Sequence, residues 1–268
     1  MSSSISSSSR KIAVITGASS GIGAAYAERL AQRGYDLVLV ARRADRLQAL
    51  ASKIAAEYGV EVQSLVADLG TEAGQVVVEN LLTSNERVSM LVNNAGIARL
   101  APIAGGGLQD SLAQIALNIT ALTRLTHAVL PGLKARNEGA IINIASVLGL
   151  HTLPISSVYS GTKAFVLAFS RGLQQELAET KVRIQAVAPA ATATEVWDQS
   201  GVPLAALAPE TVMATDAMVD AALVAFDKGE DVTLPSVADA AAIERFDTAR
   251  VALFAASQTG QVAPRLQS

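Results

Sequence analysis

Short apolar runs alternate with longer amphipathic stretches along most of this chain. The runs predict buried strands over residues 12–15, 37–40, 60–66, 90–92, 140–144 and 183–187. The stretches between them repeat apolar residues at helical spacing and predict helices over 24–33, 45–58, 72–84, 108–135, with a break near Pro131, and 157–179. Strands that are apolar without alternation are typical of a parallel sheet covered by helices on both faces. The pattern therefore predicts an α/β fold with a doubly wound parallel sheet.

The alternation continues without a break in composition, which favours a single domain over residues 11–235. The serine-rich start, residues 1–10, lacks the apolar core of a secretory signal, so we interpret it as a disordered tail or as a remnant of cloning or of a start site. Residues 236–268 are predicted to be a C-terminal extension with an amphipathic segment at 241–254. We expect this extension to pack on the body or on a neighbouring subunit.

The amino-acid composition says little more about the fold, but it excludes several kinds of chemistry. With 268 residues, of which 50% are hydrophobic and 17% charged, the chain is too apolar for a disordered protein. It has no cysteine, which excludes disulfides, thiolate metal sites and a cysteine nucleophile, and its two histidines argue against a histidine metal centre. The net charge of −3 gives no general attraction to nucleic acid, and no apolar run is long enough to span a bilayer. We expect a cytoplasmic protein that uses no metal, nucleic acid or membrane.

A glycine-rich turn follows the first predicted strand and opens the first helix. It reads Thr16-Gly17-Ala18-Ser19-Ser20-Gly21-Ile22-Gly23. Glycines let the backbone approach a pyrophosphate, whose charge is stabilised by the helix N-terminus. The spacing is not the commoner G-x-G-x-x-G, and a purely structural turn is the alternative. Its place in a Rossmann-type sheet favours a dinucleotide site formed by Gly17, Ser19, Ser20, Gly21, Ile22 and Gly23.

The end of the second predicted strand bears on which dinucleotide binds. A site for NAD usually has an acidic residue there, which binds the ribose 2′-hydroxyl. This chain has Arg42 and Arg43 and no acid. Two guanidinium groups suit a 2′-phosphate, to which Ser19 and Ser20 would add hydroxyl donors. The alternative is a solvated arginine pair at the start of a surface helix.

Tyr159 and Lys163 lie four residues apart at the start of a predicted helix, which places them on one helical face. A neighbouring ammonium group favours the phenolate, so we expect Lys163 to lower the pKa of Tyr159. Ser146 follows the fifth predicted strand and would lie at the same carboxyl edge of the sheet. Taken alone, the pair is a weak signal, because many such pairs are surface residues.

These motifs together resemble the short-chain dehydrogenase/reductase family from about residue 11 to residue 235. The similarity rests on several motifs in the family's order and spacing. They are the glycine turn, Asp68-Leu69, Asn93-Asn94-Ala95-Gly96, Asn118, Ser146, Tyr159 and Lys163.

The resemblance implies a bound nicotinamide dinucleotide, NADP(H) given the two arginines. Asp68 and Leu69 would hold its adenine. Asn94 would lie beside the adenosine ribose and, with Ala95 and Gly96, would bind the cofactor, and the motif Asn93-Asn94-Ala95-Gly96 would brace the central strands.

The resemblance also implies how the catalytic residues divide their work. Ser146 would hydrogen-bond the substrate oxygen, and Tyr159 would be the general acid in reduction or the base in oxidation. Lys163 would hold the nicotinamide ribose, and Asn118 would hold a water that relays protons through Lys163. Hydride would pass between the nicotinamide ring and the carbonyl carbon.

One stretch departs from the family pattern. Family members usually have Pro-Gly after the sixth strand, and this chain has Pro189-Ala190. Thr194 matches the family's threonine near the nicotinamide, and we expect Pro189, Thr192 and Thr194 to contact the cofactor. If the backbone at residue 190 needs a positive φ, alanine would shift this loop.

The substrate pocket would be built from three loops, residues 99–107, 147–155 and about 190–215, of which 189–209 is expected to form a lid. Besides Ser146 and Tyr159, we expect Leu148, His151 and Trp197 to line it. His151 is interpreted as a wall residue rather than a second acid, and Arg99 as solvated.

The leading hypothesis is an NADPH-dependent carbonyl reductase that acts reversibly on a ketone or aldehyde. An NAD-dependent alcohol or sugar dehydrogenase is the first alternative, and a non-catalytic dinucleotide-binding regulatory protein is the second. The resemblance further implies a homodimer or homotetramer that pairs through helices at about 108–136 and 157–179.

Overall fold

A seven-stranded parallel sheet forms the centre of the computed structural model, which describes residues 10–267. The strand order is β3-β2-β1-β4-β5-β6-β7. The strands are β1 (Ile12–Thr16), β2 (Asp36–Ala41), β3 (Val62–Val66), β4 (Val88–Asn93), β5 (Gly139–Ile144), β6 (Val182–Val187) and β7 (Val232–Thr233). The predicted doubly wound α/β fold is confirmed, and β7 is a short edge strand that the apolar pattern did not predict.

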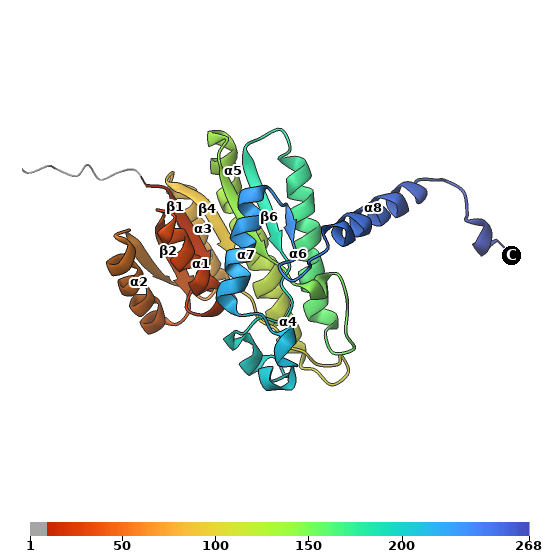
Figure 1. Ribbon diagram of the computed structural model, residues 1–268, viewed down its shortest axis with the longest axis horizontal. Coiled ribbons are helices and arrows are strands. Elements are labelled where there is room, and N and C mark those ends of the chain that lie inside the picture. The colour runs from red at the N-terminus through yellow and green to blue at the C-terminus, as the bar shows by residue number, and fades with distance from the viewer. Residues whose placement is uncertain (1–9, 268) are drawn as a thin grey trace, which may run out of the picture. The chain divides into compact units, whose positions relative to one another are not determined.

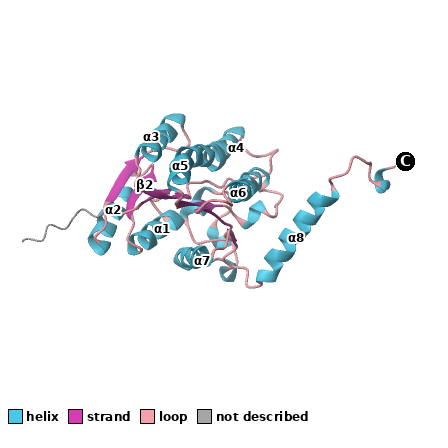
Figure 2. Ribbon diagram, turned by 90° about the horizontal axis from the view of Figure 1, so that it is seen from above, coloured by secondary structure: helices cyan, strands magenta, loops and turns pink. Residues whose placement is uncertain are grey.

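Helices cover both faces of the sheet (Figures 1 and 2). The helices before residue 235 are α1 (Gly21–Gln32), α2 (Ala44–Tyr58), α3 (Glu72–Ser84), α4 (Leu108–Ile115), α5 (Leu122–Arg136), α6 (Ser157–Glu176) and α7 (Thr215–Lys228). A further helix, α8 (Ala240–Ala256), belongs to the C-terminal part of the chain. Apolar residues of α1, α2 and α7 share one core cluster, and those of α3, α5 and α6 share another. Because the crossovers run to both sides, the loops at the carboxyl ends of the strands diverge between β1 and β4, where the strand order reverses.

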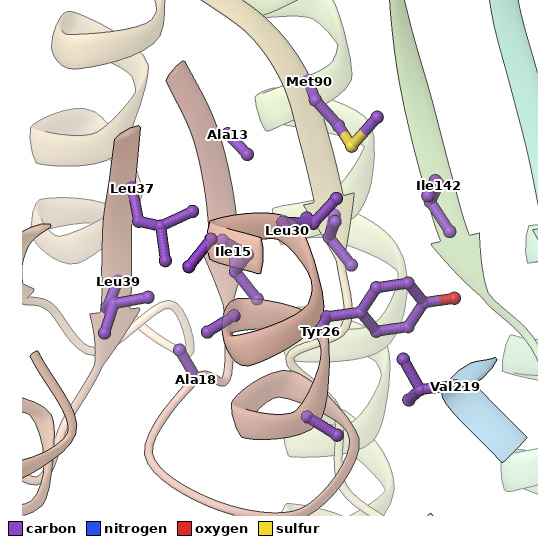
Figure 3. Packing of buried hydrophobic residues seen from close by; sticks show 14 of the residues in the cluster. Ala13, Ile15, Ala18, Tyr26, Leu30, Leu37, Leu39, Met90, Ile142 and Val219 are labelled. Carbon is purple, nitrogen blue, oxygen red and sulfur yellow. The ribbon is translucent and has the colours of Figure 1, made fainter. Parts of the chain in front are cut away.

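The side chains of β1 show how one buried strand supplies both cores. Ala13 and Ile15 belong to the cluster under α1, whereas Ile12 and Val14 belong to the opposite one. Figure 3 shows the first cluster, in which Tyr26 of α1 points across the sheet toward Ile142 and Val219. Residues that alternate between two apolar layers must all be apolar, which explains the unbroken runs in the sequence.

The long helical stretch after residue 107 is interrupted earlier than predicted. Helix α5 continues through Pro131, and the irregularity is a π-helical segment, Ala116–Ala121, between α4 and α5. Proline removes one backbone donor, but the buried face of α5, with Leu125, Val129 and Leu133, keeps the helix packed on the sheet.

The chain divides after Pro235 into two compact units. In the second, α8 includes the predicted segment 241–254, but its apolar residues are spread around the axis instead of forming one face, so the predicted amphipathicity is wrong. None of the residues of α8 is buried. The packing of this extension stays a prediction, and residues 1–9 of the predicted tail lie outside the described part. Within residues 10–267, no helix has both the length and the apolarity needed to cross a membrane.

A chain of buried polar side chains joins the central strands to α6. Asn93 of β4 donates to the Asn143 side chain on β5 at 2.9 Å and to Thr126 of α5 at 3.2 Å. Asn143 donates to the hydroxyl of Ser170 at 2.9 Å, and Ser170 donates to the Val166 carbonyl at 2.8 Å. Buried polar groups are costly unless paired, so this chain fixes how β4, β5 and α6 lie against one another.

We predict that Asn143→Ala lowers the free energy of unfolding by about 2–4 kcal/mol, because it removes a buried amide and takes one hydrogen bond each from Asn93 and Ser170. Urea unfolding followed by circular dichroism measures the change. Asn80→Ala, on the exposed side of α3, is the matched control and should stay within about 0.5 kcal/mol of the wild type. Equal losses in the two variants would contradict a structural role for the chain.

Candidate active site

A cleft with a volume of about 510 Å³ opens at the carboxyl ends of the strands. It brings together most of the predicted site residues from segments far apart in sequence. They are Gly17, Ser19, Ser20, Gly21, Ile22, Arg42, Arg43, Asp68, Leu69, Asn94, Ala95, Gly96, Ser146, Leu148, Tyr159, Lys163, Pro189, Thr192, Thr194 and Trp197. Gly23, Asn118 and His151 do not line it.

The glycine turn forms the floor of one end of the cleft. Gly17 has a φ of 66°, in the left-handed region that favours glycine. Gly23 is needed for space: a Cβ there would lie 2.6 Å from Nδ2 of Asn94. Gly23 therefore lies behind the cleft, where it allows the turn to pack against the loop after β4.

Thr16 and Asn94 fix this turn to the centre of the sheet. The Thr16 hydroxyl donates to the Val92 carbonyl at 3.1 Å and accepts from the backbone N–H groups of Asn94 and Ala95, each at 3.0 Å. The Asn94 side chain donates to the carbonyls of Thr16 and Gly17 at 2.8 and 3.3 Å. The bracing expected of the Asn94 segment is thus present, and its role beside the ribose stays a prediction.

Ser146, Tyr159 and Lys163 meet at the other end of the cleft. Ser146 follows β5 and accepts a hydrogen bond from the Leu148 N–H at 3.2 Å, which orients its hydroxyl. Lys163 donates to the Ile144 carbonyl at 2.8 Å, and its Nζ lies 5.7 Å from the centre of the Tyr159 ring. One turn of α6 thus presents a phenol and an ammonium group to the same space as the serine hydroxyl.

Burial shifts both titratable groups of this trio toward their neutral forms. Burial raises the pKa of Tyr159 to about 12, and its hydrogen bond with Ser146 offsets part of the rise. Burial lowers the pKa of Lys163 to about 8. The expected lowering of the Tyr159 pKa by Lys163 is not seen, because burial of the phenol raises that pKa instead.

Asn118 lies on the π-helical segment and connects two walls of the site from behind. Its side chain accepts from the Ile97 N–H and donates to the Ile97 carbonyl, each at 2.9 Å, and it donates to Thr162 of α6 at 3.1 Å. A π-helical turn shifts side chains relative to a regular helix and is often found at functional sites. Asn118 therefore positions the loop after β4 beside α6, and its proposed proton relay stays a prediction.

The two predicted phosphate-binding arginines differ in their contacts. Arg42 is exposed at the cleft and makes no hydrogen bond or ion pair with any residue in the range 10–267. Arg43 reaches over the glycine turn, where it donates to the Ser19 hydroxyl at 2.9 Å and to the Ser20 hydroxyl at 2.7 Å. The expected grouping of two arginines and two serines is therefore present.

Sequence reasoning missed Arg46 and Glu195 at this end of the cleft. The Glu195 carboxylate accepts from Arg43 at 2.7 Å and from Arg46 at 2.5 Å. The position of Arg46, one helical turn after Arg42 and Arg43, was a usable signal for a third cation. Glu195 left no local signal, because about 150 residues separate it from both arginines.

The lid segment is held by the residues around it. Arg99, expected to be solvated, donates to the backbone carbonyl and the side chain of Gln199 at 2.7 and 2.8 Å. Trp197 donates to the Thr192 carbonyl at 2.8 Å. Within the described residues, only Asn137 has a positive φ among non-glycines, so the backbone at Ala190 is one that alanine adopts without strain.

His151 does not form the expected pocket wall. A short 3₁₀ turn, Val147–Gly149, follows Ser146, and the backbone of His151 is bonded to this turn and to α6, through Val147 at 3.2 Å and Ser160 at 3.4 Å. The residue ends up exposed and outside the cleft. Leu148 and Trp197 do line the cleft, as expected. Residues 10–267 contain no group of three or more histidine and acidic side chains suited to a metal ion.

Comparisons with known proteins agree with this architecture. A family model described as short chain dehydrogenase matches residues 11–202. The crystal structure of a short-chain dehydrogenase from Sphingobium yanoikuyae in complex with NADPH is 46% identical, with a TM-score of 0.92, over 96% of this chain and 100% of that one. A bulky-bulky ketone specific alcohol dehydrogenase from Comamonas testosteroni is 37% identical, with a TM-score of 0.88, over 97% and 100% of the two chains.

Curated relatives match a smaller part of the chain. A probable NADP-dependent dehydrogenase of Haemophilus influenzae is 40% identical over 66% of this chain and 69% of its own length. Very-long-chain 3-oxoacyl-CoA reductase-B of Danio rerio is 38% identical over 68% of this chain. The matched region spans only 60% of the length of that reductase.

Proposed function

The chain belongs to the short-chain dehydrogenase family, and we propose that it reduces a ketone or aldehyde to an alcohol with NADPH, reversibly. The observation that carries the proposal is the meeting of Ser146, Tyr159 and Lys163 in a cleft whose other end holds the glycine turn. The trio can bind and protonate a carbonyl oxygen, and the turn suits a dinucleotide. A protein that bound a dinucleotide without catalysis would need only the glycine turn and not the trio.

The residues at the glycine turn fit the adenosine and pyrophosphate portions of this cofactor. Gly17 has no side chain that would keep a ligand away from the backbone of the turn. Helix α1 begins at Gly21, which lines the cleft, so the free N–H groups of the first helical turn lie next to it. Arg42, which has no hydrogen-bond or ion-pair partner among residues 10–267, offers its guanidinium group beside the turn. Asp68 and Leu69 line the same end and would flank the adenine.

The trio supplies the proton and holds the substrate. When bound, NADPH provides the hydride that reduces the carbonyl carbon. Ser146 would donate a hydrogen bond to the carbonyl oxygen, and Tyr159 would transfer its phenolic proton to that oxygen as the alcohol forms. The ammonium of Lys163 would then stabilise the phenolate that is left, until solvent reprotonates it. In oxidation the same proton transfer runs in reverse.

Preference for NADPH over NADH is proposed from charge. The end of β2 carries arginines and lacks the acidic residue that usually accepts a hydrogen bond from the ribose 2′-hydroxyl of NAD. A 2′-phosphate would find Arg42 together with the hydroxyl groups of Ser19 and Ser20. The NADPH bound in the Sphingobium yanoikuyae structure supports this assignment.

For the substrate we propose a hydrophobic carbonyl compound. Leu100, Leu148, Val196 and Trp197 line the cleft, and their side chains offer few polar partners to a sugar. The ketone specificity named for the Comamonas testosteroni protein and the 3-oxoacyl substrate named for the Danio rerio protein are both in keeping with such a wall.

A homodimer or homotetramer is also proposed. Leu108, Leu112 and Ile115 lie on one face of α4 and are exposed in the single chain. An apolar stripe of this kind is typical of a surface that another subunit covers.

We predict that Tyr159→Phe lowers kcat for carbonyl reduction by about 10²–10⁴-fold, the usual contribution of a positioned general acid. NADPH should still bind, because the ring and the glycine turn are unchanged. Steady-state NADPH oxidation and fluorescence titration measure the two effects. Tyr58→Phe, outside the cleft, is the control, and turnover by Tyr159→Phe at the rate of this control would contradict the mechanism.

Wild-type kcat/KM should be higher for NADPH than for NADH. Arg42→Ala should reduce the value for NADPH by about 10–100-fold, because hydrogen bonds to charged groups contribute roughly 1.5–3 kcal/mol. The value for NADH should not change. Lys228→Ala removes an exposed cation outside the cleft and should leave both values unchanged. A wild-type preference for NADH would identify the protein as an NAD-dependent dehydrogenase instead.

The rate of reduction should depend on the charge of Lys163. Since its pKa is about 8, the ammonium is present below that pH and lost above it, whereas Tyr159, with a pKa of about 12, keeps its proton throughout. We therefore predict that kcat/KM for reduction is level at acid and neutral pH and declines as the pH rises through 8. Lys163→Arg should be slower but lack this decline, because arginine stays charged. A wild-type profile that is level up to pH 10 would contradict this assignment.

A further inference from the structure

One carboxylate in the cleft holds two of its arginines. Glu195 is the first residue of a short 3₁₀ helix, Glu195–Gln199, in the lid segment. Its two oxygens accept hydrogen bonds from different guanidinium groups, Arg43 at 2.7 Å and Arg46 at 2.5 Å. Arg43, whose other nitrogens hold Ser19 and Ser20, thereby links the glycine turn to the lid.

This carboxylate lies where the proposed function requires an anion from the cofactor. Arg43 is one of the two cations at the end of β2, and its contacts with Ser19 and Ser20 group the donors that a 2′-phosphate needs. In this structure the Glu195 carboxylate pairs with the guanidinium groups of Arg43 and Arg46. Arg42, by contrast, is unpaired among the described residues and remains available to a ligand.

The same segment extends from this anion site toward the catalytic end of the cleft. Thr194 lies against the glycine turn, since a Cβ added at Gly21 would be 3.1 Å from its methyl group. Trp197 lines the cleft and bonds to the Thr192 carbonyl, and Gln199 is held by Arg99. A ligand that separates Glu195 from the arginines would therefore also affect residues 195–199, which line the proposed substrate site.

We propose that Glu195 determines cofactor specificity as an internal carboxylate that occupies Arg43 and Arg46 and is exchanged for the 2′-phosphate of the cofactor. The exchange frees residues 195–199 from the anion site. A dinucleotide with a 2′-phosphate therefore changes the conformation of the lid, and one without it does not. The proposal rests on the proposed use of NADPH.

The charges favour such an exchange. A phosphate monoester carries about 1.5 to 2 negative charges and three acceptor oxygens, whereas a carboxylate carries one charge and two oxygens. Guanidinium groups bind both in the same forked geometry, so one can replace the other. Hydrogen bonds from Arg43 and Arg46 lower the pKa of Glu195 to about 2, which keeps the carboxylate charged at any assay pH. A ribose 2′-hydroxyl has no charge with which to displace it.

The test measures the binding of two probes that differ only in the 2′-phosphate, adenosine 2′,5′-diphosphate and 5′-AMP, by calorimetry. Removing the competing carboxylate with Glu195→Gln should tighten the diphosphate by about fivefold, the size expected of half-exposed ion pairs. The affinity for 5′-AMP should not change. Asp198→Asn removes another acid from the same short helix, one without an ion pair among residues 10–267, and should change neither affinity.

Trp197 provides a second readout, because it is the only tryptophan of the chain and lies on the segment in question. In the wild type, the diphosphate should shift its fluorescence emission and 5′-AMP should not. In Glu195→Gln the emission should already be shifted before any ligand is added.

Several results would overturn the proposal. An unchanged or weaker affinity of Glu195→Gln for the diphosphate would show that Glu195 does not compete, and that it instead holds Arg43 in place for the ligand. Weaker binding of 5′-AMP would show that the carboxylate holds the ribose 2′-hydroxyl. If the wild type bound the diphosphate no more tightly than 5′-AMP, the proposed cofactor would fail as well, whereas a wild-type preference without an effect of Glu195→Gln would overturn the exchange alone.

Discussion

The hydroxyl of Thr16 joins the two central strands at the point where the sheet changes direction, and the cleft is built around that junction. It bonds to the Val92 carbonyl and to the N–H groups of Asn94 and Ala95. Those bonds fix the turn after β1 to the loop after β4. In a parallel sheet with crossovers to both sides, the loops at the carboxyl ends of the strands diverge where the strand order reverses, between β1 and β4. The polar residues of the cleft therefore converge at this edge.

Burial sets the chemistry of the catalytic end. Lys163 is 6% exposed and donates to a backbone carbonyl, yet its burial favours the neutral amine, and the phenol of Tyr159 is likewise held in its neutral form. A neutral phenol suits the donation of a proton to a carbonyl oxygen, and the nearby lysine can stabilise the phenolate only after transfer. Burial thus keeps the proton on the phenol of Tyr159.

Charge sets the chemistry of the opposite end, and the two ends are connected through the lid. Arg43 and Arg46 are paired with Glu195, and Arg99 with Gln199, so both ends of one 3₁₀ helix are fastened to the cleft rim. The ion pairs of Glu195 with Arg43 and Arg46 are half-exposed, and ion pairs of this kind are individually weak. Under the proposed exchange, an anion bound by these arginines would also affect the lid residues that line the cleft.

From residue 12 to residue 187 the sequence alone predicted the order of strands and helices, because strands buried on both faces must be apolar throughout and helices must repeat their apolar residues at helical spacing. It predicted neither α7 nor β7. It also identified Gly17, Ser146, Tyr159 and Lys163, since glycine turns and a tyrosine–lysine pair at helical spacing are local features. It could not place His151, whose position depends on a short turn bonded to α6, or find the irregularity at Asn118 in place of Pro131, because tertiary packing decides where a helix deforms. Only the tertiary structure brought Glu195 to Arg43 and Arg46, because a contact across about 150 residues has no local pattern and is fixed by the path of the chain over the sheet.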